Sequence, residues 1–351
     1  MKKIVLSAIV VASLAMTVQA ETTTTPVNTS KEVTQTTKVT PENYGLAETQ
    51  VIFNGYLKKM AAVSGTNGTG VWLHNKKGAD PKDKKVMRIN FDTIYSFAIV
   101  DLTEPVTLVM PETNGRYQSA WIITEDHYNP FSFEKAGEYT LTQKSVGNRY
   151  AMIAIRTQAN VEDPKDMEEA NALQEKLVLK QKDRGEYKAS HKWDMADIMK
   201  MREHYQELQR KTGITTEVMF GAKGLRTLEQ HNIGTSFGWG GLTPKQAVYP
   251  AYNPTSSKPQ TLTLKDVPVN AFWSITVYDK GGYPQTDTYN INSQFAKKNE
   301  DGSVTIHFGG DAKASNYMET FKDWNFILRL YQPTEAYFDG SWKLPKLVEV
   351  K

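Results

Sequence analysis

The 351-residue chain contains no cysteine. Disulfide bonds, thiolate zinc sites, iron–sulfur clusters and cysteine nucleophiles are therefore excluded, and core burial alone must stabilise the fold. The six histidines form neither an H-x-x-x-H nor an H-E-x-x-H pattern, so we predict no metal site and no cofactor. The formal net charge is only +3, which argues against the clustered basic surface that a nucleic-acid partner requires.

Long apolar runs are missing except at the N-terminus. Residues 1–20 combine Lys2 and Lys3 with the apolar stretch Ile4–Val18, which predicts a secretory signal peptide. The stretch is too short for a membrane span, so we expect an exported protein of the periplasm or cell envelope with no integral span after cleavage. Loss of the two lysines lowers the formal net charge from +3 to about +1. Residues 21–43 are rich in threonine and lack aromatic residues, which predicts a disordered leader.

The remaining residues divide into three parts. Residues 44–160 begin with apolar residues at helical spacing and continue as short strand-like segments, which predicts a β domain with an N-terminal helix. Residues 161–228 carry charged helical patterns and are expected to form a helical connector. Residues 229–351 return to short strands, among which Ala271–Asp279 alternates in the manner of a half-buried antiparallel sheet. The expected fold is mainly β (α+β), with two antiparallel β-sandwich or jelly-roll-like domains.

Tyrosine and tryptophan are frequent, with 17 and 7 copies, and both combine a large apolar ring with a polar group. They occur beside amide, carboxylate and guanidinium groups on the strand-like segments of residues 90–121. We therefore expect a cleft that binds a small polar or glycan-like ligand. The candidate residues are Asn90, Asp92, Tyr95, Arg116, Tyr117 and Trp121, with His231 and Trp239 closing the cleft.

Three charged groups in or beside the strands have competing explanations. Asp92 is more simply a turn former at the start of a strand, with its side chain bonded to the backbone. Arg116 is suited to an anion or to stacking on a sugar or carboxylate ligand. Arg329 alternates with Leu328 and Leu330, so solvent exposure is its ordinary explanation. If its face is covered, it must be paired, most simply with a carboxylate.

A hydrolase acting on an envelope glycan or ester is the alternative function. Asp92 and Asp126 could supply the two carboxylates of glycoside hydrolysis, a reaction that depends on their separation in space. Residues 234–238 match the G-x-S-x-G nucleophile elbow, with Ser236 as nucleophile and His231 as candidate base. The flanking residues lack the strand–turn–helix context of that motif, so we favour a glycine-rich turn.

The expected partners differ between these hypotheses. The binding and hydrolase hypotheses require a small polar or glycan ligand. A third hypothesis, a self-associating structural protein of the envelope, requires a homo-oligomer instead.

Several separated motifs together resemble a known family. They are Asn90–Ser96 (NFDTIYS), Arg116–Gln118 (RYQ), Ala271–Asp279 (AFWSITVYD), Asn299–Ile306 (NEDGSVTI), Leu328–Pro333 (LRLYQP) and Asp339–Pro345 (DGSWKLP). From about Leu46 to Val350 the chain is similar to bacterial exported proteins that pair domain of unknown function 1254 with domain of unknown function 1214. The resemblance implies a two-domain architecture rich in β-sandwich structure, and it implies no activity or catalytic residue.

Overall fold

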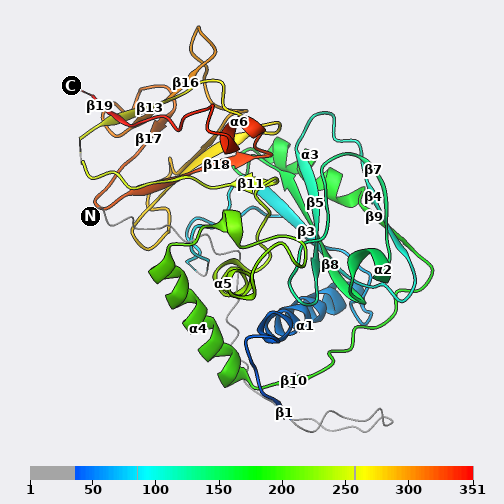
Figure 1. The fold of residues 1–351 in the computed structure, drawn as a ribbon. Coiled ribbons are helices and arrows are strands. Elements are labelled where there is room, and N and C mark those ends of the chain that lie inside the picture. Colours follow the sequence, from blue (N-terminus) through cyan, green and yellow to red (C-terminus); the bar gives the residue numbers. More distant parts are fainter. Residues whose placement is uncertain (1–35, 85, 257, 351) are drawn as a thin grey trace.

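The computed structural model describes residues 36–84, 86–256 and 258–350 (Figure 1). The predicted signal peptide and most of the predicted leader lie outside the described residues. The chain is mainly β, with several antiparallel sheets and with helices packed beside them. The sheets form two units, one in cyan and green on the right of Figure 1 and one in yellow to red at the upper left. Within the described ranges, no helix has the length and apolarity that crossing a bilayer requires.

The first β unit is built from two antiparallel sheets that share one apolar core. Its strands are β2 (Leu73–Asn75), β3 (Thr93–Asp101), β4 (Val106–Met110), β5 (Gln118–Thr124), β6 (Ser132–Phe133), β7 (Gly137–Leu141), β8 (Tyr150–Gln158) and β9 (Val178–Gln181), with the short helix α2 (Gln143–Val146) before β8. The five-stranded sheet has the order β2-β3-β8-β5-β6, and the three-stranded sheet has the order β7-β4-β9. Val100, Leu108 and Ile122 pack between them.

β8 is the central strand of the five-stranded sheet, and all of its residues are buried. Ile153 and Ile155 point into the core between the two sheets. Met152 and Ala154 point to the opposite face, where they share a cluster with residues of α1 (Tyr44–Ser64). A strand that is covered on both sides needs no polar face, which explains its almost continuous apolar sequence.

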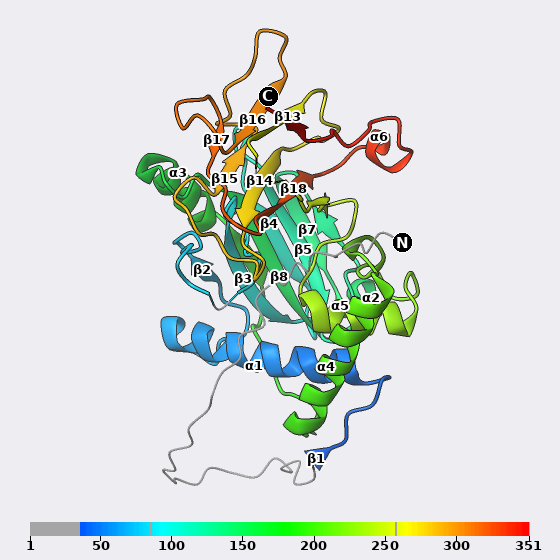
Figure 2. The same ribbon diagram turned by 90° about the vertical axis from the view of Figure 1, so that its left-hand side faces the viewer.

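α1 runs across the strands of this sheet (Figure 2). Phe53, Leu57 and Met60 are buried at the helical spacing from which the sequence predicts this helix. Gly65 follows in the left-handed conformation, with φ 67°, and its N–H donates to the Ala61 carbonyl. Glycine adopts this conformation without a steric penalty, so it ends the helix.

The second β unit also has two sheets over a shared core. Its elements are β11 (Ala247–Val248), β12 (Ala251–Tyr252), β13 (Gln260–Leu264), β14 (Trp273–Tyr278), β15 (Asn290–Asn292), β16 (Val304–Phe308), β17 (Tyr317–Met318), β18 (Asn325–Tyr331), α6 (Glu335–Phe338) and β19 (Val348–Glu349). One sheet has the order β11-β18-β14-β15, with β12 also paired to β18, and the other has the order β17-β16-β13-β19. Ile275, Ile306 and Leu328 pack between the sheets.

β14 shows the predicted alternation but not the predicted exposure. Trp273, Ile275 and Val277 point into the core of the second unit. The alternate residues are buried as well, because the segment that precedes β3 covers them. The Tyr278 hydroxyl donates to the Ile89 carbonyl at 3.0 Å. The expected half-buried sheet is therefore buried on both faces, and its polar face lies against the first unit.

The segment between the units differs from a purely helical connector. It contains α3 (Pro164–Glu175), β10 (Lys192–Trp193), α4 (Met195–Thr212) and the 3-10 turn η1 (Thr216–Val218). It also contains β9, which pairs with β4 and completes the three-stranded sheet of the first unit. Periodicity alone does not reveal this strand, because only four residues form it and its burial is partial. A jelly-roll strand order stays a prediction.

The glycine-rich segment predicted to be a turn is helical. Residues 234–238 lie inside α5 (Leu228–Gly238), which Thr227 caps by accepting a hydrogen bond from the Gln230 N–H. Gly234 is needed for packing, since an added Cβ would lie 2.9 Å from the Met219 Cβ. Tertiary contact thus outweighs the low helix propensity of glycine.

The end of the predicted disordered leader is ordered over residues 36–43. β1 (Thr36–Thr37) pairs in parallel with β10. Val39 is buried in a cluster with Tyr44 and Trp193. This segment cannot form a core alone, but a strand partner elsewhere in the chain supplies its hydrogen bonds.

Candidate functional site

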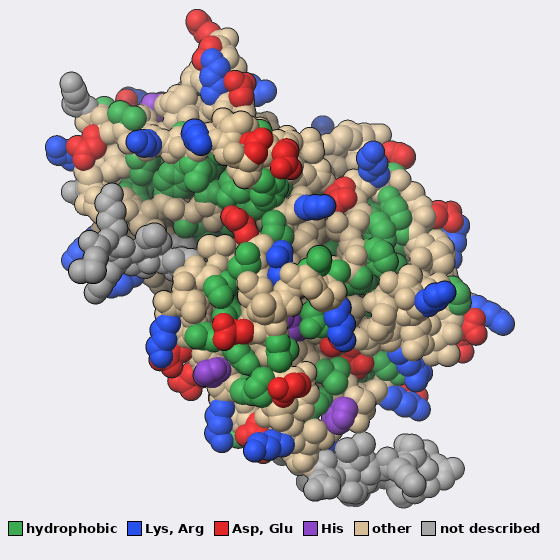
Figure 3. All heavy atoms as spheres, viewed as in Figure 1, with side chains coloured by type: hydrophobic (Ala, Val, Ile, Leu, Met, Phe, Trp, Pro, Cys, Tyr) green, Lys and Arg blue, Asp and Glu red, His purple; other side chains and the backbone are tan. Residues whose placement is uncertain are grey.

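Surface charge does not single out a binding surface on the face shown in Figure 3. Basic and acidic side chains are interspersed there among apolar ones. The most unusual polar groups of the chain lie instead in the interior, where the two β units meet.

One face of the five-stranded sheet carries a buried group of polar side chains, here called the polar layer. In the register of the sheet, Arg156 on β8 lies between Tyr95 on β3 and Ser119 on β5. The next row along the strands pairs Thr93 with Gln158, whose N–H donates to the Tyr117 carbonyl at 2.9 Å. The polar layer consists of Thr93, Tyr95, Tyr117, Ser119, Arg156 and Gln158.

Arg156 is the centre of the polar layer and is only 2% exposed. Its guanidinium lies over the rings of Tyr95 and Trp121, with Cζ 5.4 and 5.1 Å from the ring centroids. Nη1 donates a long hydrogen bond of 3.5 Å to the Tyr249 hydroxyl, and Nε has no partner within the described part of the chain. An arginine so buried is normally paired with a carboxylate.

Other atoms of the polar layer also lack partners. Among the described residues, the Thr93 hydroxyl and both side-chain amide atoms of Gln158 are buried and form no hydrogen bond. Thr93 is 1% and Gln158 0% exposed, so bulk solvent does not reach these groups. Buried polar atoms in folded proteins almost always have a partner, and each unsatisfied group costs about 1–3 kcal/mol. Thr93, Arg156 and Gln158 hold four such atoms on one sheet face, and further buried atoms without a partner among the described residues lie elsewhere, for example at Gln118 and Asn129.

Aromatic residues of the second unit cover the polar layer. The Tyr331 ring stacks on Phe272, with centroids 4.2 Å apart. Both rings contact Tyr117, at 5.7 and 5.4 Å. Tyr249 adds a third ring beside Arg156. The site is thus a closed interface between the two units, with charge and polar atoms on one side and aromatic rings on the other.

Asp92 links the two units beside this layer and is fully buried. Its carboxylate accepts hydrogen bonds from the Ser274 hydroxyl at 2.5 Å, the Tyr331 hydroxyl at 3.0 Å and the Asn290 amide at 3.1 Å. Asn90, and not Asp92, forms a turn of the predicted kind. The Asn90 side-chain oxygen accepts a hydrogen bond from the Asp92 N–H at 2.7 Å. The Asp92 side chain itself does not bond the backbone, so it is a structural link between the units.

Tyr117 and Tyr331 are protonated at neutral pH. Burial raises the pKa of Tyr117 to about 12. Burial and the nearby Asp92 carboxylate raise the pKa of Tyr331 well above its ordinary value. Burial by itself lowers the pKa of Arg156, but the surrounding phenol oxygens outweigh it and the net direction is upward. The guanidinium therefore keeps its charge, and the neutral phenols around it do not neutralise that charge.

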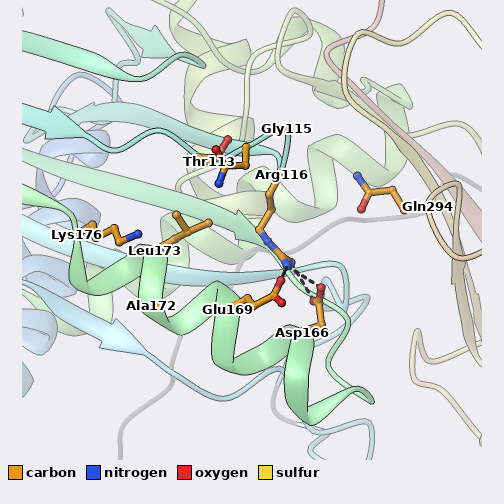
Figure 4. Close-up of a pocket in the computed structure, with 10 residues that line it drawn as sticks. Thr113, Gly115, Arg116, Asp166, Glu169, Ala172, Leu173, Lys176 and Gln294 are labelled. Carbon is orange, nitrogen blue, oxygen red and sulfur yellow. Dashed lines mark hydrogen bonds and ion pairs between the residues drawn. The ribbon is translucent and has the colours of Figure 1, made fainter.

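Arg116 lies outside the polar layer, in an open cleft of about 600 Å³ (Figure 4). Its guanidinium donates to both Asp166 oxygens at 2.7 and 2.9 Å, to Glu169 at 3.1 Å and to the Gln158 carbonyl at 3.0 Å. The bond to Asp166 raises the pKa of Arg116. Because two carboxylates already occupy this arginine, the predicted anion-binding role does not fit it.

His231 and Trp239 lie at the two ends of α5 and do not close the polar layer. His231 stacks on Tyr128, with ring centroids 4.0 Å apart, and burial lowers its pKa to about 4. The Trp239 indole donates to the Thr49 hydroxyl at 2.9 Å. Trp239 and Trp121 belong to the same apolar cluster, so Trp239 helps to pack the Trp121 ring that lies under Arg156.

His127, which the sequence favours as a satisfied surface or rim residue and not as a ligand, is buried beside α5 with both ring nitrogens bonded. Nε2 accepts from the Gly240 N–H at 2.8 Å, so Nδ1 carries the proton and donates to the Thr235 hydroxyl at 2.7 Å. Burial holds its pKa well below the usual value. A neutral histidine with both nitrogens occupied is a structural link, not a free base.

The residue pairs proposed for hydrolysis do not meet. Asp92 lies beside Ala159 and Asp126 follows Thr124, which pairs with Ala151 at the other end of β8. Eight residues at about 3.3 Å per residue separate these ends by roughly 26 Å. Glycoside hydrolysis requires about 5 to 9.5 Å between the carboxyl groups.

Ser236 does not form a nucleophile–base pair with His231. Its hydroxyl donates to the Ile233 carbonyl at 3.0 Å within α5, and it is 3% exposed. His231 instead contacts Tyr128. A nucleophile elbow presents its serine at a sharp turn, and this serine lies inside a helix.

The structure brings together Asn90, Asp92, Tyr95, Tyr117 and Trp121, and places Arg116, His231 and Trp239 elsewhere. Sequence reasoning missed Arg156, Gln158, Tyr249 and Tyr331. One signal for Arg156 was present, because a charged residue interrupts the apolar run Tyr150–Ile155 in a strand expected to be buried. Tyr249 and Tyr331 carry no such signal, since only the docking of the two units brings them to β8.

Residues 70–181 match the model of a family described as "Protein of unknown function (DUF1254)", and residues 253–335 match one described as "Protein of unknown function (DUF1214)". The chain belongs to the family of proteins that carry these two regions in this order. Arg156 lies in the first region and Tyr331 in the second, so the closed interface joins the two.

Two solved structures resemble this chain. The crystal structure of the VPA0106 protein from Vibrio parahaemolyticus has a TM-score of 0.62 and 17% sequence identity, covering 89% of this chain and 98% of that one. At this identity the likeness concerns the fold alone. An uncharacterised protein from Burkholderia cenocepacia has a TM-score of 0.45 and 12% identity, covering 88% and 94% of the two chains. A comparison with functionally curated proteins finds no match.

Proposed function

We propose that this protein binds a small polar molecule in the polar layer between its two β units. The observation that carries the proposal is the set of buried atoms without partners at Thr93, Arg156 and Gln158. A bound molecule with several hydrogen-bonding groups would satisfy these atoms together, whereas the folded chain leaves them unsatisfied. The site therefore has a few converging polar groups among aromatic walls, which is typical of a small-molecule site.

The aromatic residues favour a ring-shaped, hydroxylated ligand such as a sugar. Tyr95 and Trp121 line the sheet side of the layer, and Phe272 and Tyr331 line the other side. Aromatic faces bind apolar faces of such a ring while polar groups bond its edge. Entry of the ligand requires movement of the covering rings, so association should be slower than for an open cleft.

We propose further that the mature protein acts outside the cytoplasm, in the periplasm or cell envelope. The basis is the sequence of residues 1–20, with two lysines followed by a short apolar stretch. Mass spectrometry of the mature protein from its native host should place the first residue at Glu21. An intact Met1 in that sample would contradict export by this route.

Ligand binding is tested by thermal unfolding of the purified protein with a panel of sugars, sugar acids, polyols and small carboxylates. A ligand at 100 times its Kd stabilises the folded state by about 2.7 kcal/mol, which gives a measurable rise in Tm. The Gln158→Leu variant removes two unsatisfied atoms and should lose the response. The control, Arg184→Met, removes an exposed charge outside the polar layer and should keep it.

Two outcomes would remove the proposal. A response that Gln158→Leu retains in full would place the ligand elsewhere. A panel of this breadth that stabilises neither the wild type nor Arg184→Met would leave the polar layer as a purely structural interface.

A further inference from the structure

The charges of three buried arginines near the interface are balanced in different ways. Arg329 is 1% exposed and interacts electrostatically with Asp92. Arg88 is 7% exposed and interacts with Asp279. None of the three arginines forms a direct ion pair among the described residues, but the groups that act electrostatically on Arg156 are tyrosine oxygens and include no carboxylate. One positive charge in the layer is therefore left without an anion.

The groups around Arg156 are mostly hydrogen-bond donors. The guanidinium offers Nε, and the hydroxyl groups of Tyr95, Tyr117 and Tyr249 nearby can each donate a hydrogen bond. Such an environment stabilises negative charge that is brought to it. The unpaired Arg156 contributes most of this preference, since an arginine cannot release its proton in a protein.

We infer that the ligand is a hydroxylated monocarboxylic acid, such as a sugar acid, whose carboxylate pairs with Arg156; this inference rests on the proposed function. A planar carboxylate binds a guanidinium through two parallel N–H groups, and the unpartnered Nε lies on such an edge. A single negative charge matches the single unbalanced positive charge. Gln158 and Thr93 lie opposite each other in the row next to Arg156, and their unpartnered amide and hydroxyl atoms would bond hydroxyl groups of the same molecule.

A phosphate ester fits this site less well than a carboxylate. Its second negative charge would be buried without a second cation, and burial of an unpaired charge is costly. Arg329 cannot supply that cation without loss of its own bonds. They run to the Thr276 hydroxyl at 2.7 Å, the Tyr278 hydroxyl at 2.6 Å and two backbone carbonyls.

The test is calorimetric titration of the full mature chain with matched acid and neutral compounds. The pairs are glucuronate with glucose and galacturonate with galactose, and inorganic phosphate is a further arm. At least one acid should bind roughly 10- to 100-fold more tightly than its neutral partner, because a hydrogen bond to a charged group contributes about 1.5–3 kcal/mol. Phosphate should bind more weakly than that acid.

Two variants assign the preference to Arg156. Arg156→Met should abolish the difference in affinity between acid and neutral compound. Arg156→Lys should reduce it, since lysine keeps the charge but lacks the two parallel N–H donors. The exposed Arg184→Met is the control and should leave the ratio unchanged. If Arg156→Met does not fold, the Lys variant and the wild-type ratio decide the question.

The outcomes separate this inference from the proposed function. Equal binding of acid and neutral sugar, lost in Gln158→Leu, would overturn the carboxylate inference and leave the proposed function in place. Tighter binding of phosphate than of any acid would also overturn it. Failure of the whole ligand panel would instead remove the proposed function itself.

Discussion

Arg156 and Arg329 occupy similar places in the two β units but have different surroundings. Each lies on an interior strand of the larger sheet of its unit, and each is at most 2% exposed. Arg329 donates four hydrogen bonds of 2.6 to 3.3 Å to oxygens of Thr276, Tyr278, Arg88 and Ile89. Within the ranges that the structure describes, Arg156 donates one bond of 3.5 Å and its Nε has no partner.

This contrast shows that burial of a charged side chain does not by itself mark a functional site. The hydrogen bonds of Arg329 explain its burial, because they connect β18 to the segment before β3 and hold the two units together. The geometry of Arg156 has no such explanation within the chain. Groups that serve a function often lower the stability of the free protein, whereas structural groups raise it.

Replacement of Arg329 should have the largest effect. Arg329→Met removes four hydrogen bonds to oxygens of the interface and the positive charge near Asp92. We expect a loss of about 3–5 kcal/mol in the free energy of unfolding, measured by urea denaturation. The exposed Arg184→Met is the matched control, within about 0.5 kcal/mol of the wild type. A loss below about 1 kcal/mol for Arg329→Met would break the contrast between the two arginines.

Acid should destabilise the protein through its buried histidines, whereas both arginines keep their charge. The pKa of His231 is about 4 in the folded state, and an unfolded histidine has a pKa of about 6.5. The unfolded chain thus binds more protons, so stability is complete above pH 6.5 and is lost as the pH falls toward 4. The shift corresponds to roughly 3 kcal/mol, and the lowered pKa of His127 acts in the same direction.

Urea denaturation at pH 7.5 and pH 4.5 measures this pH effect. His231→Gln should reduce the difference, and the exposed His204→Gln should not. Burial raises the pKa of Glu125, so this residue stabilises the folded state in acid, opposite to the histidines. The decisive comparison is therefore between His231→Gln and His204→Gln. An unchanged pH slope in His231→Gln would contradict this assignment. The arginine variants are best compared above pH 7, where these histidines contribute no slope.

Loss of the Arg116 ion pair should have an intermediate effect. Arg116 and Asp166 form a bidentate pair with side-chain exposures of 14% and 15%, next to solvent in the open cleft. We expect Arg116→Met to lower the free energy of unfolding by about 1–2 kcal/mol. Lys180→Met removes a fully exposed pair with Glu138 and should change it by less than about 1 kcal/mol. Equal effects of the two variants would indicate that solvent screens Arg116 as well.

Replacement of Arg156 should have the smallest effect on stability in the absence of ligand. It is the most direct test of the difference between Arg156 and Arg329. Arg156→Met removes a buried charge without an anion, while the methionine fills a similar volume between aromatic rings. We expect the free energy of unfolding to change by less than about 1 kcal/mol or to increase. A loss comparable to that of Arg329→Met would show that Arg156 is structural and would count against the ligand site.

Sequence patterns were most informative where one element determines its own structure. Apolar spacing and Gly65 define α1, and alternation identifies the core face of β14. The family motifs identify both matched regions in their order. They were less informative for β9 and for residues 234–238, because sheet pairing and helix packing there outweigh weak local preferences.

The chemistry of the candidate site was only partly predictable. Asn90, Asp92, Tyr95, Tyr117 and Trp121 were selected from composition and do lie together. Their roles differ from the expectation, since Asp92 is a bonded link and Arg116 is paired at the surface. Arg329, expected to be exposed, is buried, and its direct partners are neutral oxygens.

The sequence by itself determined the secondary-structure elements with strong periodicity, the absence of cysteine chemistry and the family. Only the tertiary structure decided which polar groups are satisfied. Hydrogen-bond partners such as Ser274 and Asp92 are 182 positions apart, and no local pattern encodes their meeting. The same docking that satisfies Asp92 and Arg329 covers Arg156 without giving it an anion, because burial depends on which surfaces meet and pairing depends on the atoms found there.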